Sequence, residues 1–254
     1  MFGVYLMTIH QFFEKHNKIA LAFSGGVDSA YLLYAGLKAG CDIHAYYVKS
    51  AFQPQFELED AKKLAKELGA KMTILELDVL SDSIITNNPS NRCYYCKQKI
   101  FKKILEGAQA DGYKIIIDGT NASDDSSDRP GMKALQELQV LSPLRECGIT
   151  KDRVRQLSKE AGLFTWDKPA YACLATRIPT GQTITTDNLK ATEKSEKTLS
   201  DLGFTDFRIR LSGNDAKIQV REDQLEKLLF YRKEILEKLK PYYSAVTVDL
   251  EVRS

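Results

Sequence analysis

The chain has 254 residues, of which 43% are hydrophobic and 28% charged, with 36 basic and 34 acidic side chains. This composition is ordinary for a globular protein, and a net charge of +2 makes nucleic acid an unexpected partner. No apolar run approaches the roughly 18 residues of a membrane span, and no signal-peptide pattern opens the chain, so we expect a cytoplasmic protein without a membrane partner. Five cysteines, an odd number, favour thiol chemistry or metal binding over a disulfide framework.

Short apolar runs alternate with helix-like stretches through the first half of the chain, which predicts a doubly wound parallel sheet with crossover helices. The expected strands are 19–23, 43–48, 72–77 and 115–118. The expected helices are 30–37, 57–68, 97–105 and 154–161. The polar stretches 81–90 and 121–131 are expected to be loops, the first exposed and the second a flexible active-site loop.

After Pro179 the pattern changes to helix, strand, strand, helix and strand. These elements are expected over 189–202, 207–211, 216–220, 225–239 and 245–250. The order predicts a small α+β domain over 181–254 that follows an α/β domain over 1–180. Apolar residues alternate with Arg208 and Arg210 in the strand 207–211, so both arginines should lie on the face opposite the apolar one.

The segment Ser24-Gly25-Gly26-Val27-Asp28-Ser29 follows the first expected strand and opens a helix. Backbone N–H groups and the helix dipole create an anion site at such a position, and glycine lets a phosphate approach closely. The segment lacks the Gly-Lys-Ser/Thr ending of a Walker loop and the spaced glycines of a dinucleotide fingerprint. It resembles the PP-loop of ATP pyrophosphatases, Rossmann-like enzymes that cleave ATP between its α and β phosphates. The alternative is a tight strand-to-helix turn with a serine cap.

This resemblance implies residues that bind ATP and Mg²⁺. Its pyrophosphate-binding residues are Ser24, Gly25, Gly26, Asp28 and Ser29, with Asp28 also holding Mg²⁺. The resemblance also implies that the end of the second strand meets the adenosine, which adds Ser50, and that Gly119 after a later strand lies beside the nucleotide. Both placements agree with the rule that ligands lie at the carboxyl ends of parallel strands.

Several further segments, in order along nearly the whole chain, resemble the LarE family. These are ATP-dependent sulfur transferases that build the organic part of the nickel-pincer cofactor of lactate racemase. The segments are Asp128-Arg129-Pro130-Gly131, Ser142-Pro143-Leu144-Arg145, Lys168-Pro169, Ala172-Cys173-Leu174-Ala175-Thr176-Arg177, Pro179-Thr180-Gly181 and Phe207-Arg208-Ile209-Arg210. The resemblance implies adenylation of a carboxylate of pyridinium-3,5-biscarboxylic acid mononucleotide and substitution of sulfur for the activated oxygen. Activation must come first because AMP is a better leaving group than a carboxylate oxygen.

The family resemblance also implies site residues and a homo-oligomer. Asp28, Cys173 and Arg177 are the expected catalytic residues, and Arg129 is a further ATP-binding residue. The expected substrate-binding residues are Lys97, Glu196, Arg208, Arg210 and Glu222. The two strand arginines suit the substrate phosphate because each guanidinium offers a planar donor fork, whereas the alternative is a solvated strand face.

Three cysteines bear on the source of the sulfur. Cys93 and Cys96 have a spacing that lets two thiolates grip one metal centre, although this spacing also suits zinc or a redox disulfide. Cys173 stands where some LarE proteins sacrifice a cysteine sulfur and form dehydroalanine. The resemblance implies that these three cysteines instead hold a 4Fe-4S cluster whose open iron carries an extra sulfide, from a donor that the sequence does not identify. Cys41 and Cys147 are expected to be packed thiols.

Three rival functions stay open at this point. A tRNA thiolation enzyme of the 2-thiouridine or 2-thiocytidine type also combines a PP-loop with three cysteines, but the nearly neutral charge disfavours RNA. A nucleotide sensor would bind ATP without releasing pyrophosphate. An amide-forming PP-loop ligase would have a glutaminase segment before the loop.

Overall fold

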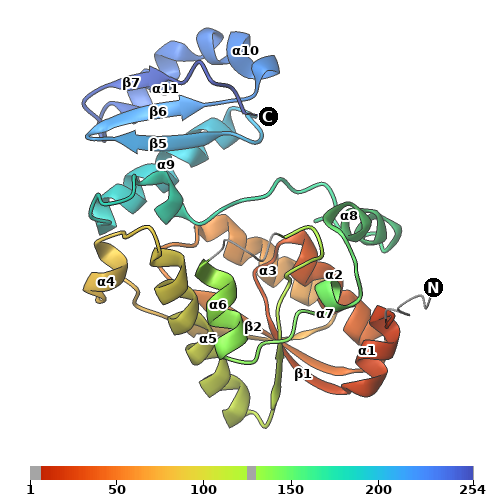
Figure 1. The fold of residues 1–254 in the computed structure, drawn as a ribbon. Coiled ribbons are helices and arrows are strands. Elements are labelled where there is room, and N and C mark those ends of the chain that lie inside the picture. The colour runs from red at the N-terminus through yellow and green to blue at the C-terminus, as the bar shows by residue number, and fades with distance from the viewer. Residues whose placement is uncertain (1–6, 125–129, 254) are drawn as a thin grey trace, which may run out of the picture. The chain divides into compact units, whose positions relative to one another are not determined.

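The computed structural model describes residues 7–124 and 130–253 and divides the chain into two compact units (Figure 1). The first unit comprises Met1–Ser50, Gln55–Leu77 and Asn91–Lys168. The second comprises Ala51–Pro54, Asp78–Ser90 and Pro169–Ser254. Two short segments of the N-terminal half therefore belong to the second unit, and the last crossing follows Lys168. The division into domains at residue 180 stays a prediction.

Four parallel strands form the sheet of the first unit in the order β3-β2-β1-β4. They are β1 (Lys18–Ala22), β2 (Asp42–Lys49), β3 (Lys71–Glu76) and β4 (Ile115–Ile117). Ile19 of β1 pairs with Ile43 of β2 on one side and with Ile115 of β4 on the other. The chain runs outward from β1 in both directions, so the carboxyl ends of β1 and β4 form a topological switch point, where ligands bind in such folds. The predicted α/β class is confirmed.

Helices cover both faces of this sheet (Figure 1). They are α1 (Ile9–Lys15), α2 (Val27–Lys38), α3 (Gln55–Glu67), α5 (Arg92–Ala110), α6 (Pro130–Glu137), α7 (Pro143–Glu146) and α8 (Lys151–Glu160). Alternation along β1 sends Ile19 and Leu21 into the core shared with α1, α2, α3 and α8, and Ala20 into the core shared with α5 and α6. This three-layer packing holds the strand ends, and the turns that follow them, in place.

Helix α5 begins at Arg92, five residues before the predicted start. The apolar period that predicted a helix over 97–105 comes from its buried middle, where Phe101 and Ile104 pack on the sheet. Its first turn is polar and aromatic, so that period does not extend to it. As a result Cys93 and Cys96 both lie on a helix, where residues three apart share a face.

The second unit contains a three-stranded mixed sheet in the order β5-β6-β7. Its elements are α4 (Ser83–Thr86), η1 (Leu174–Arg177), α9 (Thr186–Asp201), β5 (Arg208–Ser212), β6 (Asp215–Gln219), η2 (Glu222–Gln224), α10 (Leu225–Phe230), α11 (Arg232–Leu239) and β7 (Val246–Val248). The antiparallel pair β5–β6 buries Ile209 opposite Ile218, and α9 packs against β5. The predicted single helix over 225–239 is wrong, because the chain breaks into α10 and α11 at Tyr231.

The prediction of an exposed loop over 81–90 is also wrong in part. The side chain of Asp82 caps the short helix α4 by accepting from the N–H of Ile84. Asn88 is buried, and its amide donates to the carbonyl oxygens of Ile178 and Pro179 at 3.2 and 2.8 Å. The polar composition of this stretch therefore serves hydrogen bonds within the second unit. Among the described residues, none of the helices has the length and apolar character to cross a membrane.

Candidate active site

The turn between β1 and α2 depends on Gly25. Its φ is +73°, and a Cβ there would lie 3.1 Å from the Cβ of Ala61 and 3.2 Å from its Cα. Only glycine meets both the backbone angle and the close approach of α3. Gly26 is the N-cap of α2 and no side chain within the described part of the chain caps this helix. The N–H groups of the first turn of α2 are thus available to an anion.

Two serines brace this turn. The buried hydroxyl of Ser29 donates to the carbonyl of Gly26 at 3.2 Å and accepts from the N–H of Ser24 at 3.3 Å. The hydroxyl of Ser24 lies 3.2 Å from that of Ser29 and belongs to an exposed residue. Ser29 therefore holds the loop closed from inside, while Ser24 is accessible from solvent.

Asp28 has two partners that the sequence did not suggest. Lys151, the first residue of α8, places its Nζ 2.5 Å from Oδ2 of Asp28, and the amide of Asn121 donates to Oδ1 at 3.3 Å. Lys151 follows Asp28 by 123 residues, and no motif marks it. Its side chain is the positive charge that balances Asp28 at the loop.

The end of β4 lies directly against this loop. A Cβ on Gly119 would come within 3.1 Å of the Cβ of Asp28 and 3.2 Å of the N of Ser29. The buried Asp118 accepts hydrogen bonds from the hydroxyls of Thr120, at 2.5 Å, and Ser142, at 2.7 Å. Asp118 thus shapes the loop, and glycine at 119 lets β4 approach the nucleotide turn.

Other predicted ligand residues of the first unit lie in different places. Ser50 is buried at the carboxyl end of β2. The aliphatic chain of Lys97 lies against Gly131, where a Cβ would come within 2.8 Å of Cδ. This contact explains the glycine of the 128–131 motif, whereas Arg129 lies outside the described residues. Roles of Ser50 and Lys97 toward ligands stay predictions.

The cysteines fall into two groups. Burial raises the pKa of the Cys41 thiol to about 11, and that of Cys147 is also raised mainly by burial, as expected of packed thiols. Cys93 is exposed and Cys96 is partly buried on α5, whereas Cys173 precedes η1 in the second unit. In the part of the chain that the structure describes, no three His, Cys, Asp or Glu side chains are grouped to hold a metal. Cys93 and Cys96, two of the predicted cluster ligands, share a face of α5. The three-cysteine site stays a prediction.

In the second unit, Arg177 and Glu196 form a buried ion pair. Their exposed fractions are 2% and 4%, and the guanidinium Nε and Nη2 donate to the two carboxylate oxygens at 2.8 and 3.2 Å. The N–H of Ile209 donates to the same carboxylate at 3.0 Å. Burial alone would lower the pKa of Arg177, but the hydrogen bonds and charge of Glu196 outweigh it and raise this pKa. The guanidinium of Arg177 therefore stays charged although it is buried.

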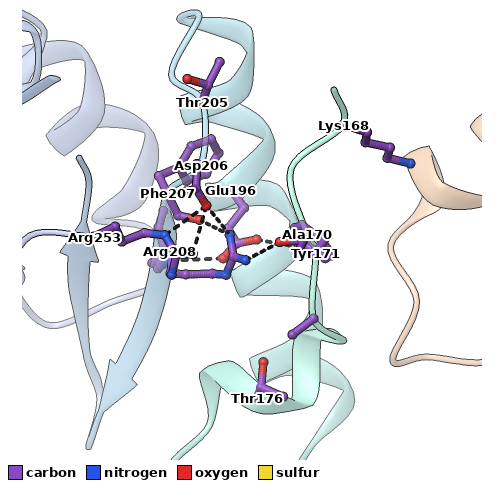
Figure 2. A network of polar contacts seen from close by, with 12 residues as sticks. Lys168, Ala170, Tyr171, Thr176, Glu196, Thr205, Asp206, Phe207, Arg208 and Arg253 are labelled. Carbon is purple, nitrogen blue, oxygen red and sulfur yellow. Dashed lines mark hydrogen bonds and ion pairs between the residues drawn. The ribbon is translucent and has the colours of Figure 1, made fainter. Parts of the chain in front are cut away.

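Arg208 and Arg210 differ in exposure. Arg208 is 7% exposed, and its Nη1 and Nη2 donate to the carbonyls of Phe207 and Ala170, each at 2.6 Å (Figure 2). Arg208 is thus bonded to the carbonyl of Ala170 within the same unit, and the contact of both arginines with the substrate phosphate stays a prediction. Arg210 and Glu222 are exposed. Burial, then the charges of Arg177 and Arg253, lower the pKa of Arg208.

A glycine turn that leads from the central strand of a parallel sheet into an uncapped helix, with an aspartate in its first turn, defines a PP-loop ATP pyrophosphatase. Residues 18–96 match the family model described as queuosine biosynthesis protein QueC. The chain is also 34% identical, over 92% of its length and 86% of the relative, to pyridinium-3,5-bisthiocarboxylic acid mononucleotide synthase of Lactiplantibacillus plantarum. The chain belongs to the LarE family of ATP-dependent sulfur transferases.

Two other relatives differ in how much of this chain they match. An uncharacterized protein of Synechocystis is 36% identical over 88% of this chain and 84% of its own length. The tRNA-specific 2-thiouridylase MnmA of Pseudothermotoga lettingae is 28% identical over 59% of this chain and 54% of its own. The similarity to the synthase thus extends through both units, whereas that to the tRNA enzyme covers a smaller share.

Proposed function

We propose that this protein adenylates a carboxylate of pyridinium-3,5-biscarboxylic acid mononucleotide and replaces the activated oxygen with sulfur, as a step in nickel-pincer cofactor synthesis. The observation that carries the proposal is the match to the synthase over 92% of the chain. The uncapped α2 N-terminus at Gly25 and Gly26 supports the ATP part of it. Two rounds of the reaction give the dithiocarboxylate.

The first step uses the residues of the nucleotide loop. The substrate carboxylate attacks the α-phosphorus of ATP, the bond to the β-phosphate oxygen breaks, and pyrophosphate leaves. The N–H groups at the start of α2 favour the negative charge of the departing pyrophosphate. In this proposal Asp28 holds Mg²⁺, and Lys151, whose Nζ lies 2.5 Å from Oδ2 of Asp28, balances added phosphate charge. The exposed Arg210 is the candidate contact to the substrate phosphate.

The second step forms a carbon–sulfur bond and releases AMP, which takes away the former carboxylate oxygen. The finer part of the proposal is a 4Fe-4S cluster held by Cys93, Cys96 and Cys173. What supports it is that all three are thiols and that Cys93 and Cys96 share one face of α5. When bound, such a cluster supplies an open iron that can carry sulfide. Cytoplasmic location and homo-oligomerisation are kept as predictions.

One alternative is a single-use enzyme. The Cys173 thiolate attacks the adenylate, AMP leaves, and elimination across the Cα–Cβ bond gives the thiocarboxylate and dehydroalanine. The similarity to the 2-thiouridylase makes tRNA a second candidate acceptor. The net charge of +2 gives it no general support.

The test compares wild type with Cys93→Ala after anaerobic reconstitution with iron and sulfide. Each protein receives ATP, Mg²⁺, sulfide and the dicarboxylate nucleotide, and thiolated product and pyrophosphate are counted per chain. Several turnovers that require both reconstitution and Cys93 support the cluster-dependent enzyme. Cys41→Ala is the matched control, because this buried thiol contacts the carbonyl of His16 and should be dispensable for turnover.

Other outcomes separate the alternatives. One turnover with loss of about 34 Da at Cys173 identifies the sacrificial route. Absence of nucleotide thiolation, together with ATP- and tRNA-dependent pyrophosphate release, rejects the proposal in favour of RNA. ATP binding without pyrophosphate release for either acceptor identifies a nucleotide sensor.

A further inference from the structure

The three residues before Cys173 are each fixed by a buried charged side chain. Nη2 of Arg208 donates to the carbonyl of Ala170 at 2.6 Å, and Nη1 of Arg177 donates to the carbonyl of Ala172 at 3.0 Å. Between them, the hydroxyl of Tyr171 donates to Oε2 of Glu196 at 2.5 Å (Figure 2). Consecutive residues are thus tied to one network of α9, β5 and η1.

The ring of Tyr171 adds a second kind of contact. The guanidinium carbons of Arg177 and Arg208 lie 4.6 and 5.5 Å from its centroid, within the range of cation–π attraction. Tyr171 therefore joins both arginines to Glu196 through its ring and its hydroxyl together. Phenylalanine at this position would keep the ring contacts and lose the hydrogen bond.

The main chain is also anchored at Cys173 and beyond it. The carbonyl of Cys173 accepts from the N–H and the hydroxyl of Thr176 at 3.0 and 2.8 Å. The next N–H, that of Leu174, donates to the carbonyl of Phe52 at 2.9 Å. The backbone that carries the thiol is therefore held from both sides, which fixes the direction of the Cα–Cβ bond and leaves the sulfur only its χ1 rotamers.

Burying these charges is costly, and a hydrophobic cluster would hold a loop at lower cost. Arg208 also approaches Asp206 at 3.7 Å, and Arg253 pairs with that same carboxylate at 2.9 Å. What the charged side chains provide and apolar ones do not is directional donation to specific carbonyl oxygens. Such directionality matters where a reacting atom must be placed within a fraction of an ångström.

We infer that Arg208 and Glu196 are positioning residues that fix residues 170–172, Arg208 through the carbonyl of Ala170 and Glu196 through the hydroxyl of Tyr171, and thereby set where Cys173 is presented. We use the name clamp for the side chains that together fix residues 170–172, which are those of Tyr171, Arg177, Glu196 and Arg208. This assigns Arg208 and Glu196 to the sulfur-transfer step instead of to contact with the substrate. The inference rests on the proposed function, because it assumes that the sulfur at Cys173 takes part in the reaction.

The experiment compares wild type with Arg208→Gln, Arg208→Lys and Glu196→Gln. Arg232→Gln is the control, since Arg232 is an exposed arginine of α11 in the same unit. Thiolated product per pyrophosphate is measured first. We expect Arg208→Gln and Glu196→Gln to release pyrophosphate within about twofold of wild type and to lose about tenfold in product per pyrophosphate, because water hydrolyses the adenylate that receives no sulfur to AMP and the original carboxylate. Arg208→Lys should be intermediate, because one ammonium cannot replace the planar fork.

Amide hydrogen exchange over 169–176, followed by mass spectrometry, is the second readout and requires no activity. Exchange in this peptide should become about tenfold faster in Arg208→Gln, with the rest of the chain unchanged. Glu196→Gln also leaves the buried Arg177 without its carboxylate, so exchange over 169–176 is compared with the rest of the unit and should rise more there than elsewhere. Unchanged exchange would overturn the clamp. A higher KM for the nucleotide substrate with product per pyrophosphate intact would also overturn the inference, because it identifies Arg208 as a substrate contact.

The remaining outcomes are equally decisive. A parallel fall of pyrophosphate release and product, with faster exchange throughout the unit, identifies a merely structural role and rejects the inference. If wild type makes no thiolated nucleotide, the proposed function fails. The exchange readout then stands alone: faster exchange confined to 169–176 supports the clamp, and unchanged exchange rejects it.

Discussion

The nucleotide loop and the clamp differ in the groups that form their hydrogen bonds. The loop at Gly25 and Gly26 presents backbone N–H groups, and it depends on glycines because a side chain at Gly25 would collide with Ala61. In the clamp, Arg177 and Arg208 donate to backbone carbonyls, and the almost fully buried Glu196 accepts from Arg177 and from the hydroxyl of Tyr171. To bind an anion from solvent, the N–H groups of the loop must have no partner within the protein. To hold a chain segment in place, the guanidinium groups of the clamp must already be bonded to that segment.

This difference predicts different failures. Substitution in the loop should damage ATP chemistry and leave the fold intact, since few side chains are involved. Substitution in the clamp should cost stability or coupling, since buried charges lose their partners.

Arg177→Met should lower the free energy of unfolding by about 3–5 kcal/mol, because it leaves Glu196 buried without its guanidinium partner. Urea unfolding followed by circular dichroism measures the change. Lys197→Met is the control on the neighbouring residue of α9, where an exposed ion pair with Asp201 should contribute less than about 1 kcal/mol. Equal effects of the two substitutions would refute the contrast between buried and exposed pairs.

Gly25→Ala should reduce pyrophosphate release by about 10- to 100-fold, because the left-handed backbone and the contact with Ala61 together disfavour a Cβ. Gly40→Ala is the matched control. Gly40 has the same φ of +73°, but no described neighbour lies within 4 Å of an added Cβ. It should cost about 1 kcal/mol of stability and leave pyrophosphate release unchanged. Similar activities in both variants would mean that the turn is not the nucleotide site.

Lys151→Ala should weaken ATP binding by about tenfold, because the carboxylate of Asp28 would then face the phosphates without its cation. Raising Mg²⁺ should restore part of the binding, since a divalent ion can neutralise the same carboxylate. Pyrophosphate release as a function of ATP, at two Mg²⁺ concentrations, measures both effects. Lys62→Ala, at an exposed position of α3, should change neither, and insensitivity of Lys151→Ala to Mg²⁺ would refute the pairing argument.

His44 should make a small pH-dependent contribution to stability. Burial lowers its pKa below the ordinary 6.5, and its ring stacks on Tyr46 while Nε2 lies 2.8 Å from the hydroxyl of Thr73. The unfolded chain therefore takes up the proton first, so this stability is present above about pH 6.5 and is lost as pH falls through the folded-state pKa. Melting temperatures at pH 7.5 and 5.5 should differ less in His44→Asn than in wild type. An unchanged difference would count against this assignment.

How much the sequence could predict follows the same division. The loop from Ser24 to Ser29 is contiguous, and its chemistry resides in glycines and a helix start, so local pattern was sufficient to identify it. The parallel sheet followed from equally local alternation. Lys151 could not be found, because a lysine at the first position of a helix is commonplace and its partner is 123 residues away.

The second unit shows the opposite case. Alternation correctly placed Ile209 in the core, but it could not indicate that Ala170 covers the strand face at Arg208. That contact joins residues 38 apart, and its acceptor is a backbone carbonyl, which any residue type provides. The sequence therefore shows where charged side chains occur. It does not show whether their hydrogen-bond partners are solvent, the substrate or other residues of the chain.

The second unit borrows Ala51–Pro54 and Asp78–Ser90 from the N-terminal half, and this has a consequence for synthesis on the ribosome. The backbone groups of Phe52, Thr86 and Asn88 bond to residues 174, 184 and 181, which emerge from the ribosome about a hundred residues later. These two segments must therefore wait for their later partners while the rest of the N-terminal half is already made, because folding proceeds as the chain lengthens. A fragment that begins at Pro169 would lack both Ala51–Pro54 and Asp78–Ser90, so we expect that it does not fold into the complete second unit by itself.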